Sequence, residues 1–551
     1  MCGIVGYVGG RQALPLLMEG LRRLEYRGYD SAGVAVALDG ALGVCKRKGK
    51  VRELESVLPA SGLAGNTGIA HTRWATHGEP SDANAHPHTD ASGRIGVVHN
   101  GIIENAAELR ARLERDGVVF RSQTDTEVLA HLIAGRTENS LVEAVRAALA
   151  QVKGAYGIAV VDAARPEAIV AARNGGPVVV GVGDGEMFVA SDAAALMGHA
   201  KSVAHLDDGE IAEVRAEGFN VLTLEGAETA KATQALEGDA AGFDKAGHAH
   251  FMMKEIAEQP DAVRRTLSGR LDPRFATAHL GGIALEAREM LDIRRVKILG
   301  CGSASFAGAL GAHMIETLAR IPAHAEAASE FRYRNPVIEQ DTLYVAVSQS
   351  GETFDTLAAV QEIKRKGGQV MGVINAVGST IARECGRGVY LHAGPEIAVV
   401  STKTWTCTAV AFALLALEFG RVRDLSTAQG QRLLSALQAL PDQIAEIVAR
   451  AEELRPLAAR LALAEHIYFL GRSAGCPVAE EGALKLKEVS YLHAEAYAAS
   501  ELKHGPLALI SPEAPSLMLL PNDDLLPKNL STLAEVRTRG GPVLAISHPE
   551  V

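Results

Sequence analysis

A cysteine stands directly after the initiator methionine, in the sequence Met1-Cys2-Gly3-Ile4. Because the Cys2 side chain is small, we expect Met1 to be removed, which leaves Cys2 with a free α-amine. A thiol beside its own α-amine is in principle a complete catalytic unit, because an α-amine with a pKa of about 7.7–8.0 can accept the thiol proton. The dipeptide alone is weak evidence, since position 2 can also merely tolerate cysteine.

Further segments of the first half carry polar side chains that could surround such a nucleophile. They are His71-Thr72-Arg73-Trp74-Ala75-Thr76-His77-Gly78, Val97-Val98-His99-Asn100-Gly101 and Gln123-Thr124-Asp125-Thr126-Glu127. The first follows a predicted strand, the second ends one, and the third opens a predicted helix. Taken singly, Arg73 could be a surface charge, Asn100 a hairpin-turn residue and Asp125 a helix N-cap.

In this order, and with the motifs Cys2-Gly3-Ile4-Val5-Gly6 and Glu25-Tyr26-Arg27-Gly28-Tyr29-Asp30-Ser31, these segments closely resemble the class II glutamine amidotransferases of the Ntn-hydrolase fold. The resemblance covers residues 2 to about 230. It implies that Cys2 attacks the side-chain amide of glutamine and forms a thioester. It also implies that Asn100 and the N–H of Gly101 form the oxyanion hole.

The same resemblance implies how glutamine is held. Arg73 would pair with the α-carboxylate, where a planar bidentate donor fits, and Asp125 would take the α-ammonium. Trp74, Thr76 and His77 would lie in a loop that shapes and closes the pocket. In this family Trp74 would also gate the exit for ammonia.

Hydroxyl-rich loops in the second half follow predicted strands or open predicted helices. They are Gly302-Ser303-Ala304-Ser305, Ser348-Gln349-Ser350-Gly351-Glu352-Thr353 and Val399-Val400-Ser401-Thr402-Lys403. Hydroxyls and backbone N–H groups at helix starts suit a phosphate, although they are also ordinary N-caps. Their shared position, at the carboxyl ends of strands, is where open α/β sheets bind ligands. A dinucleotide site is rejected, because the full Gly-x-Gly-x-x-Gly pattern and a matching acidic residue are missing.

The last third adds a predicted helix containing Lys485 and Glu488, which share a face at i,i+3, and a turn in which His504 precedes Gly-Pro. Alone, these would be a surface ion pair and a loop histidine. With the hydroxyl-rich loops they resemble the sugar isomerase (SIS) domains of the isomerising aminotransferases that convert fructose 6-phosphate to glucosamine 6-phosphate. This match runs from about residue 250 to the end.

The SIS resemblance implies roles for these side chains. Glu488 would be the base that moves a proton between C1 and C2, His504 would assist ring opening, and Lys485 would support proton traffic. Because this family builds its sugar site at a dimer interface, we expect a homodimer through the SIS domains, in which the neighbouring subunit could supply His504. The phosphate and the sugar hydroxyls would be held by Ser303, Ser348, Gln349, Ser350 and Thr353, with Val399 and Ser401 nearby.

The predicted order of helices and strands that must position these residues differs between the two halves of the chain. Short apolar strands with helices near 11–24 and 104–116 predict antiparallel sheets with packed helices, which the resemblance makes a four-layer Ntn-hydrolase α+β domain over residues 2–230. Residues 231–250 are predicted to be a linker. Strands then alternate with helices, so the overall class is α/β, with doubly wound parallel-sheet SIS units at 251–440 and, cut short, at 441–551.

Composition excludes several classes of protein. The 551 residues carry 55 basic and 66 acidic side chains, a net charge of −11 that argues against general nucleic-acid binding. Six cysteines do not make a disulfide framework and suit the cytoplasm. No apolar run reaches the roughly 18–20 residues of a membrane span. Neither a metal nor another cofactor is expected, because the cysteines and histidines form no closely spaced ligand cluster.

The sequence departs from the family pattern at Ala304, where a hydroxyl is usual, and at Ser500, where glycine is usual. It also lacks the family's closing strand, helix and tail, whose lysine forms an imine with the sugar. We therefore expect an incomplete second SIS unit, and glutaminase activity without efficient synthesis.

The resemblance as a whole implies an enzyme that hydrolyses L-glutamine, channels the ammonia, and aminates and isomerises fructose 6-phosphate in the first step of amino-sugar synthesis. Shielding matters because ammonia in bulk water is mostly non-nucleophilic ammonium. One alternative keeps the glutaminase but takes another SIS-type phosphosugar or acts as a deglycase. Another is a sugar-phosphate-binding regulator with a decayed glutaminase, which the intact Cys2, Arg73, Asn100 and Asp125 argue against.

Overall fold

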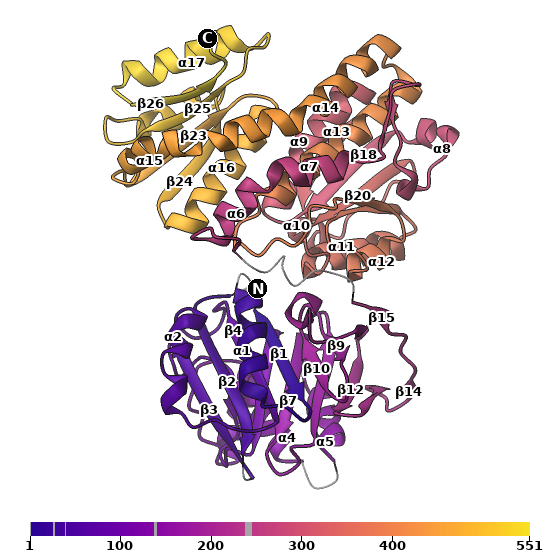
Figure 1. The fold of residues 1–551 in the computed structure, drawn as a ribbon, viewed down its shortest axis with the longest axis vertical. Helices are drawn as coiled ribbons and strands as arrows, with labels where there is room; N and C mark the ends of the chain where they lie inside the picture. The colour runs from indigo at the N-terminus through magenta and orange to yellow at the C-terminus, as the bar shows by residue number, and fades with distance from the viewer. Residues whose placement is uncertain (1, 26–27, 39, 137–139, 237–244, 551) are drawn as a thin grey trace. The chain divides into compact units, whose positions relative to one another are not determined.

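The computed structural model describes residues 2–25, 28–38, 40–136, 140–236 and 245–550, and the chain divides into two compact units, Met1–Asp244 and Lys245–Val551 (Figure 1). The division falls within the predicted linker at 231–250. Part of that segment, residues 237–244, lies outside the described residues. Its beginning is not free chain, because Gln234–Ala235 forms the edge strand β15 of the first unit.

Two antiparallel sheets lie at the centre of the first unit. The larger has the order β15-β11-β9-β10-β1-β4-β2-β3, and the smaller has the order β14-β13-β12-β8-β7-β6-β5. The larger sheet contains β1 (Gly3–Val8), β2 (Ser31–Leu38), β3 (Ala41–Lys48), β4 (Thr67–Arg73), β9 (Val179–Val182), β10 (Met187–Ala190) and β11 (Ser202–His205). The smaller contains β5 (His88–Thr89), β6 (Ile95–Ile103), β7 (Gly154–Asp162), β8 (Ala168–Asn174), β12 (Glu210–Arg215), β13 (Gly218–Thr223) and β14 (Glu228–Thr229).

Strand β1 is buried along its whole length, which explains its apolar sequence. Successive side chains of a strand point to opposite faces. Ile4 and Val8 accordingly enter the core between the two sheets, whereas Val5 and Tyr7 enter the core beneath the helices of the larger sheet.

Helices cover the outer face of each sheet. On the larger sheet, α1 (Ala13–Leu24) and α2 (Val51–Glu55) bury their apolar sides. On the smaller sheet, α3 (Ala106–Arg115), α4 (Glu127–Ala134) and α5 (Leu141–Leu149) do the same. The order helix, sheet, sheet, helix confirms the predicted four-layer α+β domain.

The second unit begins with a parallel sheet of order β19-β18-β20-β21-β22. Along β20, Leu343, Val345 and Val347 face one apolar core, and Tyr344 and Ala346 face the other. Helices therefore cover both faces, and the sheet is doubly wound as predicted. Its strands are β18 (Arg295–Gly300), β19 (Ala323–Ala327), β20 (Thr342–Ser348), β21 (Gln369–Ile374) and β22 (Gly388–Tyr390). Its helices are α6 (Phe251–Ala257), α7 (Gln259–Leu267), α8 (Ala287–Asp292), α9 (Ser303–Ala319), α10 (Ala328–Tyr333), α11 (Phe354–Arg365), α12 (Thr380–Cys385) and α13 (Lys403–Arg423).

A second parallel sheet has the order β24-β23-β25-β26, which repeats the first four positions of the preceding sheet. Its strands are β23 (His466–Gly471), β24 (His493–Ala498), β25 (Ser516–Leu520) and β26 (Val543–Ser547). The accompanying helices are α15 (Arg455–Leu461), α16 (Gly475–Ser490) and α17 (Leu526–Thr538). In this repeat, β23 corresponds to β18 and α16 corresponds to α9.

Two long helices lie between the parallel sheets in sequence. Helix α14 (Thr427–Ala449) continues through Pro441, so the predicted domain boundary at residue 440 falls inside a helix. Among the described residues, α13 is the one helix with the length and composition of a membrane span, and 67% of its most apolar window is buried inside the protein. That burial is typical of the core helix of a doubly wound unit.

Candidate functional site

Cys2 lies immediately before β1, next to the end of β4. The antiparallel pairing of Gly3 with Thr72 brings its thiol to the backbone of Trp74, whose N–H donates to Sγ at 3.2 Å. Burial raises the pKa of the Cys2 thiol, and this effect outweighs the opposing effects of the Trp74 N–H and the Arg73 guanidinium. The resting thiol is therefore protonated and needs a base before it can attack.

Asn100 comes from the neighbouring sheet and meets Cys2 directly. Its Nδ2 donates to the Cys2 carbonyl oxygen at 3.0 Å. The next residue, Gly101, has a φ of +144°, and a Cβ there would lie 2.0 Å from the Ala155 carbonyl oxygen. Only glycine fits this position, so the strand end that presents Asn100 depends on it.

His71 supports Asn100 from beneath. Its Nε2 lies 2.9 Å from Asn100 Oδ1 and 3.1 Å from the His99 carbonyl oxygen. Both partners are acceptors, so Nε2 carries the proton, and the Nδ1 atom is buried with no partner among the described residues. Burial lowers the pKa of His71 to about 3, which keeps the ring neutral. With Oδ1 occupied in this way, the Nδ2 of Asn100 faces Cys2.

Arg73 is buried at the end of β4. One guanidinium nitrogen, Nη2, donates to the carbonyl oxygens of His77 and Gly78. The other, Nη1, has no hydrogen-bond partner in the part of the chain that the structure describes. An unpaired buried donor is costly, and a carboxylate of a bound substrate would satisfy it.

The loop after β4 is exposed and anchored from one side. Trp74 is 44% exposed, and its ring meets Tyr29 edge-to-face at 5.2 Å. The Ala75 N–H donates to Asp30 Oδ2 at 2.8 Å, which fixes the backbone of the loop. Thr76 and His77 are exposed beyond it. An anchored base with an exposed tip suits a segment that covers a pocket.

Asp125 is buried just before α4. Its Oδ2 accepts from the Ile103 N–H at 2.9 Å, which attaches it to β6 two residues beyond Gly101. It lies close enough to Arg73 to raise the pKa of that guanidinium, although burial has the larger, lowering effect. The arrangement therefore places a carboxylate and a guanidinium close to each other, a pair that can bind the two α-groups of an amino acid.

Sequence reasoning assigned no role to several buried histidines around this site. The rings of His71 and His86 lie 4.2 Å apart, and those of His86 and His88 lie 4.7 Å apart. His88 and His99 each bond a threonine hydroxyl before α4, at Thr124 and Thr126. His71 stands in the quoted motif, and its position two residues before Arg73 on a strand was the available signal, because such residues share a face.

In the second unit, two hydroxyl-rich loops meet at a topological switch point. Strands β18 and β20 are neighbours, and the helices that follow them, α9 and α11, pack on opposite faces of the sheet. The predicted Ser303 begins α9. The predicted Ser348 ends β20, where its Oγ lies 3.1 Å from Thr353 Oγ1 and accepts from the Gly351 N–H at 3.0 Å. Ligands of open α/β sheets bind at such a point.

Helix α16 brings the predicted proton-transfer residues to this place. Lys485 Nζ donates to Ser303 Oγ at 2.8 Å, across 182 residues of sequence, and forms an ion pair with Glu481. Glu488 lies one turn further along the helix. Burial raises the pKa of Glu488, and the Lys485 charge opposes that shift. A partly desolvated carboxyl group with a raised pKa suits proton transfer.

The other predicted sugar-site residues make no hydrogen bond to the Ser303 or Ser348 side chains or to α16 among the described residues. Val399 is 42% exposed, and the Ser401 hydroxyl bonds Thr404 Oγ1 at 2.6 Å. Gln349 and Ser350 are half-buried in the loop after β20. The His504 side chain is exposed and makes no hydrogen bond or ion pair to any other described residue.

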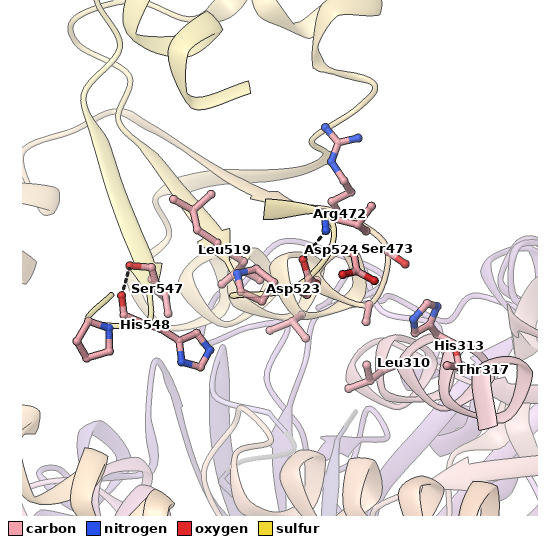
Figure 2. Close-up of a pocket in the computed structure, with 18 of the residues that line it drawn as sticks. Leu310, His313, Thr317, Arg472, Ser473, Leu519, Asp523, Asp524, Ser547 and His548 are labelled. Atoms are coloured by element: carbon pink, nitrogen blue, oxygen red, sulfur yellow. Dashed lines mark hydrogen bonds between the residues drawn. The ribbon is translucent and has the colours of Figure 1, made fainter. Parts of the chain in front are cut away.

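A cavity of about 900 Å³ opens at the carboxyl edge of the second parallel sheet (Figure 2). It occupies the place in this repeat that the hydroxyl-rich loops occupy in the first. None of the predicted sugar-site residues lines it, and Asp523 and Asp524 at its wall would repel a phosphate. The guanidinium of Arg472 donates instead to protein groups, from Nε to Asn529 Oδ1 at 3.1 Å and from Nη2 to Thr532 Oγ1 at 3.2 Å. The cavity is therefore not the predicted sugar site.

The described residues contain no group of three or more histidine, cysteine or acidic side chains placed to hold a metal ion. All six cysteines are free.

Comparison with known proteins agrees with this architecture. A glutamine amidotransferase domain model matches residues 61–249, and an SIS domain model matches residues 289–418 and again 460–550. The chain is thus an amidotransferase domain joined to two SIS domains. This confirms the family resemblance read from the motifs.

Relatives resemble the chain over nearly its whole length. Glutamine–fructose-6-phosphate aminotransferase (isomerizing) of Symbiobacterium thermophilum is 50% identical over 548 residues, which are 99% of this chain and 90% of that protein. An enzyme of the same name from Thermus thermophilus is 50% identical over 552 residues, with the same coverage. The solved C-terminal domain of glucosamine-fructose-6-phosphate aminotransferase from Francisella tularensis is 37% identical, with a TM-score of 0.54 over 56% of this chain and 86% of that one. The chain belongs to the glutamine–fructose-6-phosphate aminotransferase (isomerizing) family.

Proposed function

We propose that the protein transfers the amide nitrogen of glutamine to fructose 6-phosphate and isomerises the product to glucosamine 6-phosphate. Identity of 50% across both units to enzymes of this name supports the whole reaction, and not the glutaminase activity without efficient synthesis that the sequence pattern predicts. The observation that carries the glutamine half is the Asn100 amide donor lying 3.0 Å from the Cys2 carbonyl, beside the thiol. The observation that carries the sugar half is the bond from Lys485 to Ser303.

In the first step, the α-amine of Cys2, freed by removal of Met1, takes the thiol proton. The thiolate attacks the side-chain carbonyl carbon of glutamine, and the resulting oxyanion accepts hydrogen bonds from Asn100 Nδ2 and the Gly101 N–H. The intermediate collapses as the ammonium form of the α-amine returns its proton to the leaving nitrogen. Ammonia departs, and water then hydrolyses the thioester to glutamate.

Glutamine is held by its α-groups. The unpaired Nη1 of Arg73 binds the α-carboxylate, and Asp125 binds the α-ammonium. The loop of Trp74, Thr76 and His77 covers the substrate, and Trp74 gates the release of ammonia. Ammonia passes to the sugar without entering bulk water, where it would be protonated and lose its nucleophilicity.

The sugar phosphate lies at the switch point between β18 and β20. Hydroxyl and backbone groups of Ser303 and of the Ser348–Thr353 loop hold the phosphate, with Val399 and Ser401 beside the sugar. Glu488 moves the proton between C2 and C1, and Lys485 holds charge next to it. The protein acts as a homodimer, and His504 of the partner subunit assists ring opening. A cytoplasmic location suits the free cysteines.

Substitution of Cys2 by alanine tests the proposal. Glutamine-dependent formation of glucosamine 6-phosphate should vanish, whereas formation from added ammonium salts should survive, because the sugar site does not use the thiol. The matched control is Cys45→Ala, which removes a partly exposed thiol from β3. Glutamine-dependent synthesis that persists in the Cys2 variant would exclude the proposed nucleophile.

A further inference from the structure

The loop between β22 and α13 carries Val399 and Ser401, and it contains no helix or strand of its own. Backbone N–H groups in such a loop have no ladder partners, so other groups must satisfy them. Whatever binds those N–H groups also decides where Val399 and Ser401 stand.

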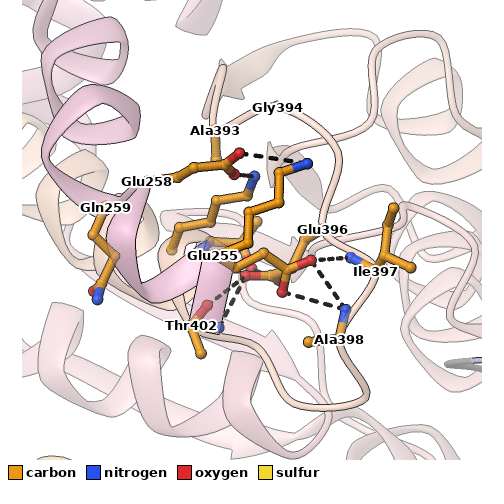
Figure 3. A network of polar contacts seen from close by, with 12 residues as sticks. Glu255, Glu258, Gln259, Ala393, Gly394, Glu396, Ile397, Ala398 and Thr402 are labelled. Carbon is orange, nitrogen blue, oxygen red and sulfur yellow. Dashed lines mark hydrogen bonds and ion pairs between the residues drawn. The ribbon is translucent and has the colours of Figure 1, made fainter. Parts of the chain in front are cut away.

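Glu255 of α6 binds the loop on the side before Val399 (Figure 3). Its buried carboxylate accepts from the Ile397 N–H at 2.5 Å and from the Ala398 N–H at 3.0 Å, both through Oε1. The second oxygen, Oε2, lies 3.2 Å from the Ala398 nitrogen. One buried carboxyl group thus accepts from two successive backbone N–H groups, which anchors the loop directly before Val399.

Glu396 binds the loop on the side after Ser401. Its Oε1 accepts from the Thr402 N–H at 2.9 Å and from the Thr404 N–H at 3.1 Å, and its Oε2 accepts from the Thr404 hydroxyl. That same hydroxyl lies 2.6 Å from Ser401 Oγ. The three residues 399–401 are therefore bracketed by two carboxylates, of which one belongs to the loop and the other, Glu255, to a separate helix.

A second contact ties the same helix end to the far end of the loop. Glu258, directly after α6, pairs with the buried Lys403 at 2.5 Å, where α13 begins. Figure 3 shows Glu255 and Glu258 close together, Glu255 within α6 and Glu258 at the cap that ends it. The loop is thus attached to α6 at its middle, through Glu255, and at its α13 end, through Glu258, so a shift of α6 would move the loop with it.

We propose that Glu255 is a positioning residue for the sugar phosphate: by holding the N–H groups of Ile397 and Ala398, it keeps residues 399–401 in the conformation that binds fructose 6-phosphate. The inference rests on the proposed function, in which Val399 and Ser401 face the sugar. Glu255 does not touch the sugar itself.

Burial of the Glu255 carboxyl group disfavours its charged form. Burial, together with the charge of Glu396, raises the pKa of Glu255 to about 7, although the loop N–H groups oppose the shift. A glutamine side chain would avoid the desolvation of a charge while retaining one acceptor oxygen. Glu255→Gln is therefore expected to fold at least as well as the original protein, and to hold the loop less firmly.

The test measures the dissociation constant for fructose 6-phosphate by titration calorimetry, which needs no turnover. Glu255→Ala should weaken binding about tenfold or more, because it removes the hydrogen bonds to the N–H groups of Ile397 and Ala398, directly before Val399. Glu255→Gln should fall between the original protein and Glu255→Ala. The kcat and KM of glutamine hydrolysis without sugar should stay unchanged in both, since Cys2 lies in the other unit. The matched control is Asp261→Asn, which removes an exposed carboxylate of α7 bonded to Arg264, and it should leave the dissociation constant unchanged.

Ser401→Ala separates failure of this inference from failure of the proposed function. If Ser401→Ala weakens sugar binding and both Glu255 variants do not, Glu255 is not a positioning residue. If none of the three changes the dissociation constant, the loop does not face the sugar, and that part of the proposed function falls with the inference. If Glu255→Ala fails to fold, the result with Glu255→Gln decides, because its melting temperature reports folding separately from binding.

Discussion

The Nε2 of His71 lies 2.9 Å from Asn100 Oδ1, and this hydrogen bond sets which end of the Asn100 amide faces Cys2. The amide has one donor end and one acceptor end. The neutral, buried His71 presents a donor, so it captures the acceptor end and leaves Nδ2 directed at Cys2. A neutral histidine thereby orients the Asn100 donor toward Cys2 without adding charge there.

Replacing His71 by leucine should lower kcat for glutamine hydrolysis by about 10- to 100-fold, with little change in KM for glutamine. The Asn100 amide would then be free to turn its oxygen toward the oxyanion, whereas loss of an oxyanion donor outright typically costs about 100- to 1,000-fold. His71→Gln retains a donor and should recover part of the rate.

A double substitution provides the control for that prediction. In an Asn100→Ala background, adding His71→Leu should cost little more, because the group that His71 orients is already gone. Fully additive losses would mean that His71 acts on something other than Asn100.

Gly101→Ala should destabilise the first unit and reduce glutaminase activity. A Cβ at position 101 would lie 2.0 Å from the Ala155 carbonyl oxygen, on a backbone with a φ of +144°. The strand must shift or the pairing of β6 with β7 must open, and either change moves Asn100. Melting temperature and kcat should both fall, whereas Gly10→Ala, which meets nothing within 4 Å, should leave both unchanged.

The first unit should lose stability as the pH falls from about 6.5 toward 5. Burial lowers the pKa of His71 to about 3 and also lowers the pKa values of His86, His88 and His99. The unfolded chain binds protons that the folded unit cannot, so each such histidine can remove about 1.4 kcal/mol per pH unit below the unfolded pKa. Hydrogen exchange of β4 and β6 amides between pH 7 and pH 5 measures this.

A substitution of one buried histidine tests whether these histidines cause the loss of stability at low pH. A glutamine at position 88 can still bond Thr124. His88→Gln should therefore reduce the slope of stability against pH by about the contribution of one histidine proton. Glu127 does not interfere with this measurement. Burial alone would raise its pKa, but hydrogen bonds that include those from His131, Arg121 and Ser122 lower the pKa to about 2. Its contribution to stability is therefore lost only below the ordinary pKa of a glutamate. Stability that stays level down to pH 5 would contradict the prediction.

Glu488→Gln should abolish product formation from fructose 6-phosphate and ammonia, with a loss of about 100-fold or more. An amide cannot carry the proton between C2 and C1. Deuterium incorporation from heavy water into the sugar should disappear as well, while sugar binding and glutamine hydrolysis persist. The control is Glu480→Gln on the same helix, whose carboxyl group also has a pKa raised by burial and for which no role is proposed.

Much of the fold follows from the sequence, and the exceptions share a physical cause. Strands such as β1 and β20 are apolar and buried, and their patterns predict them. Strands β19 (Ala323–Ala327) and β24 (His493–Ala498) gave no such signal, because alanine, histidine and glutamate form strands poorly on their own. Both lie at the edge of a parallel sheet, where pairing with β18 or β23 makes them strands.

The candidate site, too, has features that the sequence predicts and contacts that only the structure shows. Residue types and motif order predicted Cys2, Arg73 and Asn100 as site residues, because a thiol, a guanidinium and an amide each indicate a chemical role, and the structure places Cys2 beside Asn100 and Trp74. The contact of Lys485 with Ser303 could not be read from the sequence, since it joins two repeats 182 residues apart. The hydrogen bonds of Glu255 to the loop could not be predicted either, because an isolated glutamate on a helix looks like a solvent-exposed charge until its burial is known.

The two parallel sheets have one further consequence. Helices α9 and α16 occupy equivalent places in the two copies, yet the start of α9 presents Ser303 and the middle of α16 presents Lys485 to the same point. At the equivalent place of the second copy, Asp523 and Asp524 line a cavity, and helix α16 of that copy instead contacts Ser303 of the first. The two copies thus carry different side chains at matched positions, so identical substitutions at those positions should have unlike effects on the reaction.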